Sequence, residues 1–331
     1  MKKWLVAMLA GFALVAAACG GGGSGGTDLA ELNVAYFQGW PLPPQIGQED
    51  GSFAEAVGVD TINWIPLDTG GQMTEGMQAG SVDIAYSQGL TPFAGAINSG
   101  ADLEVVGIAV SYAEADNCVV QPEVAGDLNG ATVMTPFGNV THFKMLATME
   151  HLGVDIGSLN IVEATDGATT AAQFDQGQID VGCAFGAPLV AMLDSGGSVI
   201  LSGAEQESDV GLFTYDIVSI PRQFGVDQPE AVTAFLAAMD DFNNTWAADP
   251  ATNNPIIAQA AGMEEVGNFL DGPVWFTFPT IDEQLSSDWL GGNVGAAMQA
   301  QVETLARLGG GTEAQGDFVG SVNTSFLEAI G

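Results

Sequence analysis

Short apolar runs alternate with segments of helical period through the first two thirds of the chain. Residues 31–37 and 60–66 alternate apolar and polar side chains, as a strand does. Pro41, Pro43 and Pro44 mark a loop between them, and residues 45–57 predict a short helix, so these segments form a β-α-β unit. The alternation continues with a helix over 70–80, a strand over 82–86, a helix over 91–98 and a strand over 103–110.

A second series of alternating elements begins near Cys118. The expected strands are 117–120, 131–134, 159–162, 179–185 and 198–202, and the expected helices are 140–152, 169–176 and 188–195. Residues 215–220 predict a strand that returns toward the first unit, and helices are expected over 229–248, 254–261, 281–289 and 294–308. The pattern predicts an α/β fold with a parallel sheet, arranged as two lobes with a cleft between them.

The amino terminus resembles a lipoprotein export signal. Lys2 and Lys3 precede an apolar run over 4–18 that is too short to span a bilayer, and Cys19 is followed by a Gly-rich stretch. We therefore expect residues 1–18 to be a removed signal peptide and residues 19–28 a flexible tether with lipid on Cys19. The alternative is an ordinary signal peptide with an incidental cysteine. Either way, the protein is expected in the cell envelope, facing the periplasm or the exterior.

Charge excludes two classes of partner. The 331 residues carry a formal net charge of −36, and beyond the leader only Lys144, Arg222 and Arg307 accompany 41 acidic residues. Nucleic acid and anionic membrane surfaces would be repelled, so we expect membrane contact only through the lipid anchor. Apolar residues make up 47% of the chain, which indicates a globular protein. We expect a monomer.

Cysteine and histidine usage limits the chemistry. If Cys19 carries lipid, Cys118 and Cys183 remain as a pair, for which a disulfide is the default in an oxidising compartment. The alternative is two buried free thiols. His142 and His151 lie nine residues apart, and no C-x-x-C or H-x₃-H spacing occurs, so neither a metal site nor a cofactor is expected.

Several motifs resemble the taurine-binding proteins of ABC importers, and more broadly the sulfonate, nitrate and thiamine-precursor binding family. They are residues 67–71 (LDTGG), 77–85 (MQAGSVDIA), 91–94 (TPFA), 136–142 (PFGNVTH), 177–181 (GQIDV), 187–188 (AP) and 215–216 (YD). The resemblance implies a venus-flytrap fold, with one lobe over 29–112 and 213–331, the other over 113–212, and the ligand between them. It also implies docking on the permease and ATPase subunits of an importer.

The anion of such a ligand would lie at two junctions before predicted helices. Ligands of open α/β sheets bind where helix N-termini point, and helix N-termini accept anions without a cationic side chain. We expect Lys144 to face away from this place. The expected donors are backbone N–H groups and the hydroxyls of Thr91 and Thr141. The N–H groups are those of Gly89, Leu90, Thr91, Asn139, Val140 and Thr141. The alternative is that Thr91 and Thr141 merely cap helices.

The amine end of taurine would need an acceptor, and Asp216 lies where the resemblance places a ligand carboxylate. An Asp within an apolar strand also needs a partner, because burying an unpaired charge is costly. Phe37, Trp40 and Phe185 are candidate aromatic walls around the ammonium group. His142 resembles the family's histidine in the same motif and is expected to orient the loop or to contact the sulfonate directly.

Binding, and not catalysis, is the favoured class. No G-x-S-x-G motif, metal-ligand spacing or neighbouring Cys-His pair appears, although thiamine-pyrimidine synthases resemble this fold. A zwitterion such as taurine fits anion loops on one side and a carboxylate on the other. The alternatives are a binder of another alkanesulfonate or small zwitterion, and a thiamine-precursor binder or synthase-like protein.

Overall fold

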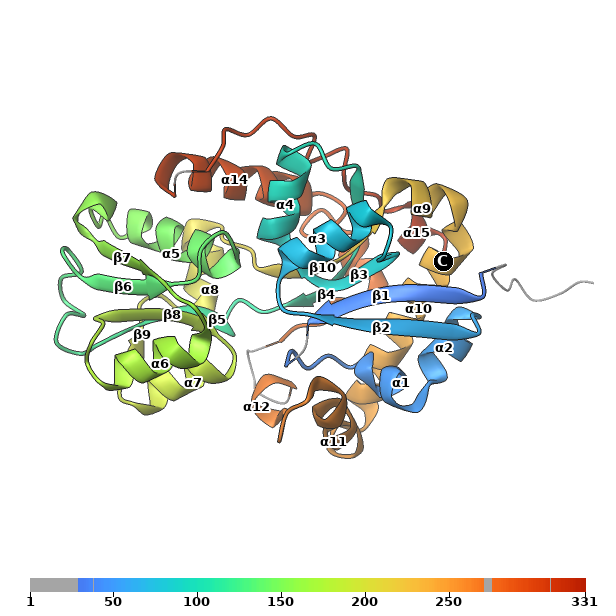
Figure 1. The fold of residues 1–331 in the computed structure, drawn as a ribbon, viewed down its shortest axis with the longest axis horizontal. Coiled ribbons are helices and arrows are strands. Elements are labelled where there is room, and N and C mark those ends of the chain that lie inside the picture. Colours follow the sequence, from blue (N-terminus) through green and yellow to red (C-terminus); the bar gives the residue numbers. More distant parts are fainter. Residues whose placement is uncertain (1–28, 38, 271–275, 310) are drawn as a thin grey trace, which may run out of the picture.

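Two sheets, each covered by helices, form the protein (Figure 1). The computed structural model describes residues 29–37, 39–270, 276–309 and 311–331. The expected signal peptide, the lipidated Cys19 and the tether over 19–28 lie outside these described residues.

The first sheet has the strand order β2-β1-β3-β10-β4. Its strands are β1 (Glu31–Phe37), β2 (Thr61–Leu67), β3 (Ile84–Gly89), β4 (Leu103–Ser111) and β10 (Tyr215–Pro221). Its helices from the first part of the chain are α1 (Gln45–Asp50), α2 (Ser52–Val57), α3 (Gly70–Ala79) and α4 (Leu90–Asn98). The apolar alternation predicted each of these strands.

The second sheet has the order β7-β6-β8-β5-β9. Its strands are β5 (Asp116–Val120), β6 (Thr132–Thr135), β7 (Asn160–Glu163), β8 (Val181–Phe185) and β9 (Ser198–Val199). The helical elements around it are α5 (Val140–His151), η1 (Ile156–Ser158), α6 (Gly167–Asp175), α7 (Ala187–Asp194), α8 (Gly203–Glu205) and η2 (Gln206–Val210). The two-lobed α/β arrangement predicted from the sequence is therefore confirmed.

The expected parallel arrangement holds except at two strands. β10 runs antiparallel to both of its neighbours, β3 and β4, and β5 runs antiparallel to β8 and β9. Both strands adjoin a passage of the chain between the sheets, and the chain enters each in the reverse direction. Alternation along the sequence reports that a segment is a strand but not which way its partners run, because those partners are distant in sequence.

The bounds of some predicted helices and of one predicted strand also change. The expected helix over 45–57 breaks into α1 and α2 at Gly51, whose φ of 79° is a left-handed conformation that glycine adopts without strain. The expected strand over 198–202 shortens to β9. The carboxyl-terminal part contains α9 (Arg222–Asp227), α10 (Pro229–Ala248), α11 (Pro250–Ala261), α12 (Gly267–Leu270), α13 (Ile281–Leu285), α14 (Asn293–Leu308) and α15 (Ser325–Glu328), of which α9, α12 and α15 were not predicted.

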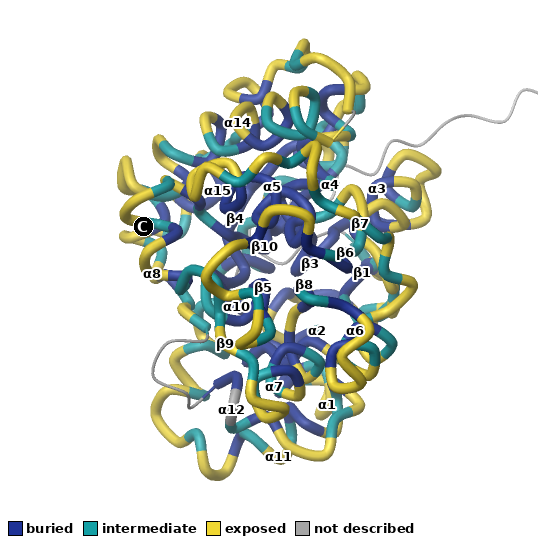
Figure 2. Tube along the Cα trace, turned by 90° about the vertical axis from the view of Figure 1, so that its left-hand side faces the viewer, coloured by how far each residue is buried: buried dark blue, intermediate teal, exposed yellow. Residues whose placement is uncertain are grey.

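Strands β3 and β4 are buried along their whole length, and β10, which lies between them, is buried up to its last residue (Figure 2). Helices cover both faces of this sheet, so its strands carry long apolar runs. Helix α14 reaches beyond the sheet and contacts both α4 and α5, which puts it against both lobes (Figure 1). Arg307 on α14 forms a salt bridge with Glu150 on α5.

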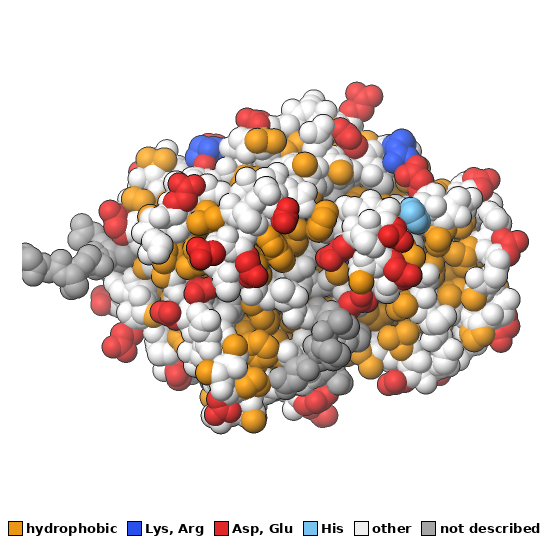
Figure 3. All heavy atoms as spheres, turned by 180° about the vertical axis from the view of Figure 1, so that it is seen from behind, with side chains coloured by type: hydrophobic (Ala, Val, Ile, Leu, Met, Phe, Trp, Pro, Cys, Tyr) orange, Lys and Arg blue, Asp and Glu red, His pale blue; other side chains and the backbone are white. Residues whose placement is uncertain are grey.

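On the face in Figure 3, acidic side chains are scattered and Lys or Arg side chains are sparse. Among the helices of the described residues, none is both long and apolar enough to cross a membrane.

Candidate ligand-binding site

The first turns of helices α4 and α5 approach each other at Gly89, the last residue of β3. Gly89 pairs with Asp216 in the β3–β10 ladder. A Cβ atom on Gly89 would lie 3.4 Å from Val140 Cγ2 and 3.7 Å from Asp216 Oδ1. Val140 begins α5 beside the second sheet, whereas Gly89 and Asp216 belong to the first. The structure thus brings three of the predicted site residues together at the junction of the lobes.

The amino terminus of α4 is buried and has no side-chain cap. Gly89 occupies the N-cap position, and Leu90 and Thr91 after it are buried. The first N–H groups of a helix have no acceptor within the helix, so an uncapped terminus suits a negatively charged group. Helix α5 differs, because Asn139 Oδ1 accepts a hydrogen bond from the His142 amide at 3.1 Å.

The two threonine hydroxyls are already bonded within the protein. Thr91 donates to Gln301 Oε1 on α14 at 2.7 Å, and Thr141 donates to Asp116 Oδ2 at 2.8 Å. Their hydrogens are therefore not directed at an anion in this conformation. Neither residue is an N-cap, because Gly89 and Asn139 hold those positions. Of the expected anion donors, the backbone amides remain.

Asp216 is buried, with 3% of its surface exposed. Burial raises the pKa of its carboxyl well above the usual value, hydrogen bonding by Tyr112 opposes this, and the negative charge of Asp116 adds to it. Trp40 also lowers the pKa of Asp216, although the indole Nε1–H makes no hydrogen bond of normal geometry. Ionised Asp216 would therefore be stabilised by a cation brought to it.

Asp116, which sequence reasoning missed, is a second buried carboxylate. It is 2% exposed and begins β5 on the second sheet. Its Oδ2 accepts the Thr141 hydrogen bond, whereas its Oδ1 is buried and has no partner among the described residues. The available signal was the one used for Asp216, a carboxylate at the edge of an apolar strand; the expected strand began one residue later, at Asn117.

We expect Asp116→Asn to stabilise the unliganded protein at pH 8. Burial raises the pKa of Asp116 from 3.8 to about 6, while Lys144 and the Thr141 hydrogen bond oppose the rise. The folded state therefore keeps a proton that the unfolded chain has lost, and stability falls as the pH rises between about 4 and about 6.

The free-energy cost of keeping Asp116 ionised in the folded protein is about 3 kcal/mol. This cost is fully present above that pH range and absent below it. Thermal unfolding of both proteins at pH 4 and pH 8 measures the difference. The asparagine variant should unfold a few degrees higher at pH 8 and at nearly the same temperature at pH 4. Equal midpoints at pH 8 would contradict the assignment.

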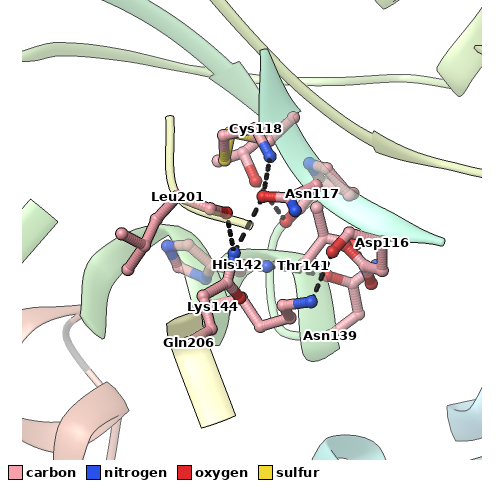
Figure 4. Close-up of a disulfide and its surroundings, with 12 residues drawn as sticks. Asp116, Asn117, Cys118, Asn139, Thr141, His142, Lys144, Leu201 and Gln206 are labelled. Carbon is pink, nitrogen blue, oxygen red and sulfur yellow. Dashed lines mark hydrogen bonds between the residues drawn. A yellow bond between two sulfur atoms is a disulfide. The ribbon is translucent and has the colours of Figure 1, made fainter. Parts of the chain in front are cut away.

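Each cationic side chain in the described part of the chain is already engaged. Lys144 is 2% exposed, and its Nζ donates to the carbonyl oxygens of Ala113, at 2.7 Å, and Asp116 (Figure 4). Burial lowers the pKa of Lys144, and nearby acidic groups, Asp116 first among them, oppose the effect. Arg222 pairs with Asp102 and Glu104, and Arg307 with Glu150.

Aromatic rings surround Trp40 near the two carboxylates. Trp40 is 6% exposed, and its ring centroid lies 5.2 Å from that of Tyr112, 5.8 Å from Phe185 and 4.7 Å from Phe276. Phe185 is 46% exposed, whereas Phe37 packs against the core of the first sheet. Tyr112 and Phe276 were not among the predicted site residues.

Comparison with known proteins identifies the family of this chain. Residues 46–253 match the family described as NMT1/THI5 like, which is more than half of the chain. The chain belongs to the NMT1/THI5-like family. The family membership inferred from the motifs is therefore confirmed.

Two curated relatives of this family member come from Escherichia coli (strain K12). A taurine-binding periplasmic protein is 31% identical over 221 residues, covering 66% of this chain and 67% of the relative. A putative aliphatic sulfonates-binding protein is 27% identical over 157 residues, covering 46% and 48%. Among solved structures, the periplasmic aliphatic sulphonate-binding protein SsuA from Escherichia coli superposes with a TM-score of 0.73 at 19% identity, covering 88% of this chain and 91% of that one.

His142 lies in the first turn of α5 and contacts the loop that precedes this helix. Its Nδ1 accepts a hydrogen bond from the Gly138 amide at 3.2 Å, and its ring stacks on Phe137 with centroids 4.7 Å apart. Burial lowers the pKa of His142, which favours the neutral ring. With Nδ1 as the acceptor, the proton of the neutral ring is on Nε2. These contacts suit the expected loop-orienting role.

Cys118 and Cys183 form a disulfide between β5 and β8, so the prediction of a bridge is confirmed and the free-thiol alternative is wrong. The two cysteines lie opposite each other in the antiparallel ladder, with Cα atoms 4.0 Å apart. Two residues away on each strand, Asp116 and Phe185 are also paired. The bridge thus ties together the two strands that carry these residues to the site (Figure 4).

A separate hollow of about 300 Å³ lies between α5, η2 and α14. Its lining includes Phe143, Phe213 and Gln301 but neither Asp116 nor Asp216, so it is not the candidate site. Across the described residues, no three His, Cys, Asp or Glu side chains are grouped as metal ligands.

Proposed function

We propose that this protein is an extracytoplasmic, lipid-anchored substrate-binding protein of an ABC importer, which binds taurine and delivers it to the membrane permease. One observation carries the proposal: the uncapped terminus of α4 and the buried Asp216 lie on either side of Gly89. An anion acceptor and a cation acceptor at one glycine suit a short zwitterion.

The sulfonate end of taurine would be held by uncharged donors. All three cations in the described part of the chain are engaged elsewhere, which leaves the first amides of α4, together with the Val140 end of α5, for the sulfonate oxygens. The ammonium end would lie at Asp216, within the ring cluster around Trp40. The taurine-binding and sulfonate-binding relatives support taurine as the ligand.

Closure of two lobes around the ligand is the mechanism we propose. The proposed lobes are residues 29–112 with 213–331, and residues 113–212; Val140 belongs to the second and Gly89 and Asp216 to the first. A ligand that contacts both lobes stabilises the closed form, and the closed monomer would dock on the permease and ATPase subunits. The protein would act as a binder and not as an enzyme, with Cys19 as its only attachment to the membrane.

A thiamine-precursor pyrimidine or another small cation is the second candidate. The observation that favours it is Asp116, because two buried carboxylates suit a more cationic ligand than a single one does. The open helix terminus favours the zwitterion, since a pyrimidine cation has no group that needs it.

A thermal-shift screen tests the proposal. The purified protein is heated in high salt with taurine, ethanesulfonate, glycine betaine, nitrate or a thiamine pyrimidine, each at the same concentration. We expect taurine to raise the unfolding midpoint most, because a ligand that binds only the folded state stabilises it. Ethanesulfonate, which lacks the amine, should raise it less. Selective stabilisation by the pyrimidine would favour the second candidate and contradict taurine.

A further inference from the structure

The unpartnered Oδ1 of Asp116 is a buried acceptor that nothing within the described protein satisfies. Buried polar atoms almost always have a hydrogen-bond partner, so an exception calls for an explanation. Asp116 is 2% exposed, and Thr141 occupies only its Oδ2. Lys144 is the nearest cation, yet its Nζ is directed at the main-chain oxygens of Ala113 and Asp116. The described residues therefore leave this oxygen free for a donor on a bound ligand.

Asp116 and Asp216 belong to different lobes but influence each other. Asp116 begins β5 of the second sheet, and Asp216 lies in β10 of the first. Tyr112 lies in the segment between β4 and β5. Burial raises the pKa of its phenol well above the usual value, and the negative charges of Asp216 and Asp116 raise it further. The Tyr112 amide also donates to the Thr214 carbonyl oxygen at 3.1 Å, which ties together the two passages of chain between the lobes.

We propose that the ligand's ammonium group bridges Asp116 and Asp216, so that this protein selects primary ammonium compounds and rejects their fully N-methylated forms. This inference rests on the proposed function and adds Asp116 as a specificity-determining residue. A primary ammonium has three N–H donors, enough for Asp116 Oδ1 and for Asp216 together. A trimethylammonium group has none, and it would leave both carboxylates desolvated and without hydrogen bonds.

The bridge also links amine recognition to closure. Two buried carboxylates that approach each other without a cation repel, so closure of the unliganded protein is disfavoured. An ammonium between them removes the repulsion and joins the lobes. A sulfonate without an amine would contact the helix termini but would leave this repulsion in place.

Calorimetry with the purified protein and four ligands tests the proposal. The ligands are taurine, N,N,N-trimethyltaurine, ethanesulfonate and β-alanine. We expect wild-type protein to bind taurine at least tenfold more tightly than the trimethyl compound. Asp116→Asn, which keeps an acceptor for Thr141, should weaken taurine binding at least tenfold, reduce the preference over the trimethyl compound below threefold, and leave ethanesulfonate binding equal or tighter.

Asp194→Asn is the matched control, since it removes one exposed negative charge from the same lobe. It should leave all four affinities within twofold. Taurine binding within twofold of wild type in Asp116→Asn would overturn the bridge, and so would equal weakening of taurine and ethanesulfonate, which a purely structural role predicts.

The proposed function can fail separately. If wild-type protein binds no sulfonate but binds β-alanine in a manner that depends on Asp116, the sulfonate assignment is wrong and the ammonium bridge stands. If neither taurine nor β-alanine binds, the bridge is overturned.

Discussion

Replacing Asp216 by asparagine should weaken taurine binding by more than tenfold, which corresponds to about 1.4 kcal/mol of binding free energy. The substitution preserves the size of the side chain but removes the charge that attracts the ammonium group. Asp216 is buried, with only 3% exposed, so solvent does little to screen that charge. Isothermal titration calorimetry on the purified variant measures the change.

Two comparisons make the Asp216 result interpretable. Asp241→Asn removes an exposed charge from α10 and should leave the affinity unchanged. Ethanesulfonate, which has no amine, should bind the Asp216 variant at least as well as it binds wild type, because the repulsion between Asp116 and Asp216 is gone. Unchanged taurine affinity would remove Asp216 as the amine partner.

Loss of the disulfide should be the largest stability effect of any change considered for this protein. The bridge closes a loop with a sequence separation of 65, which the chain-entropy model values at about 4 kcal/mol. Denaturant titration of the Cys118→Ala, Cys183→Ala double variant measures this loss directly. Alanine is the appropriate replacement because both cysteines are buried and serine would bury two hydroxyl groups.

Binding should respond to the same change. Cys118 and Cys183 join the strands that carry Asp116 and Phe185, so the double variant is expected to bind taurine several-fold more weakly while remaining folded. A thiol assay on unreduced, unfolded wild-type protein should find neither of these cysteines free. Two titratable thiols there, or an unchanged free energy of unfolding in the double variant, would contradict the stabilising role.

Local pattern alone predicted most of the elements. Strands β1, β2, β4 and β10 appear within about two residues of the expected bounds, because alternation and β-branched content report directly on half-buried and buried strands. The disulfide also followed from counting, since three cysteines with one assigned to lipid leave a single pair. The helix-terminus argument placed Gly89 and Val140 near a common site, and the family resemblance placed Asp216 there. The first turns of α4 and α5 do approach each other at this place.

Contacts between distant residues decided the rest. The sequence could not show that β10 enters the first sheet in reverse, or that the Thr91 hydroxyl donates to Gln301, 210 residues away. Nor could it show that Lys144 binds main-chain oxygens, or that no donor in the described part of the chain reaches Asp116 Oδ1. Periodicity records which side of a local element is buried, whereas hydrogen-bond partners and charge neighbours depend on which elements the folded chain brings together. The sequence therefore determined the architecture and one of the two buried carboxylates, and the tertiary structure alone revealed the second, Asp116.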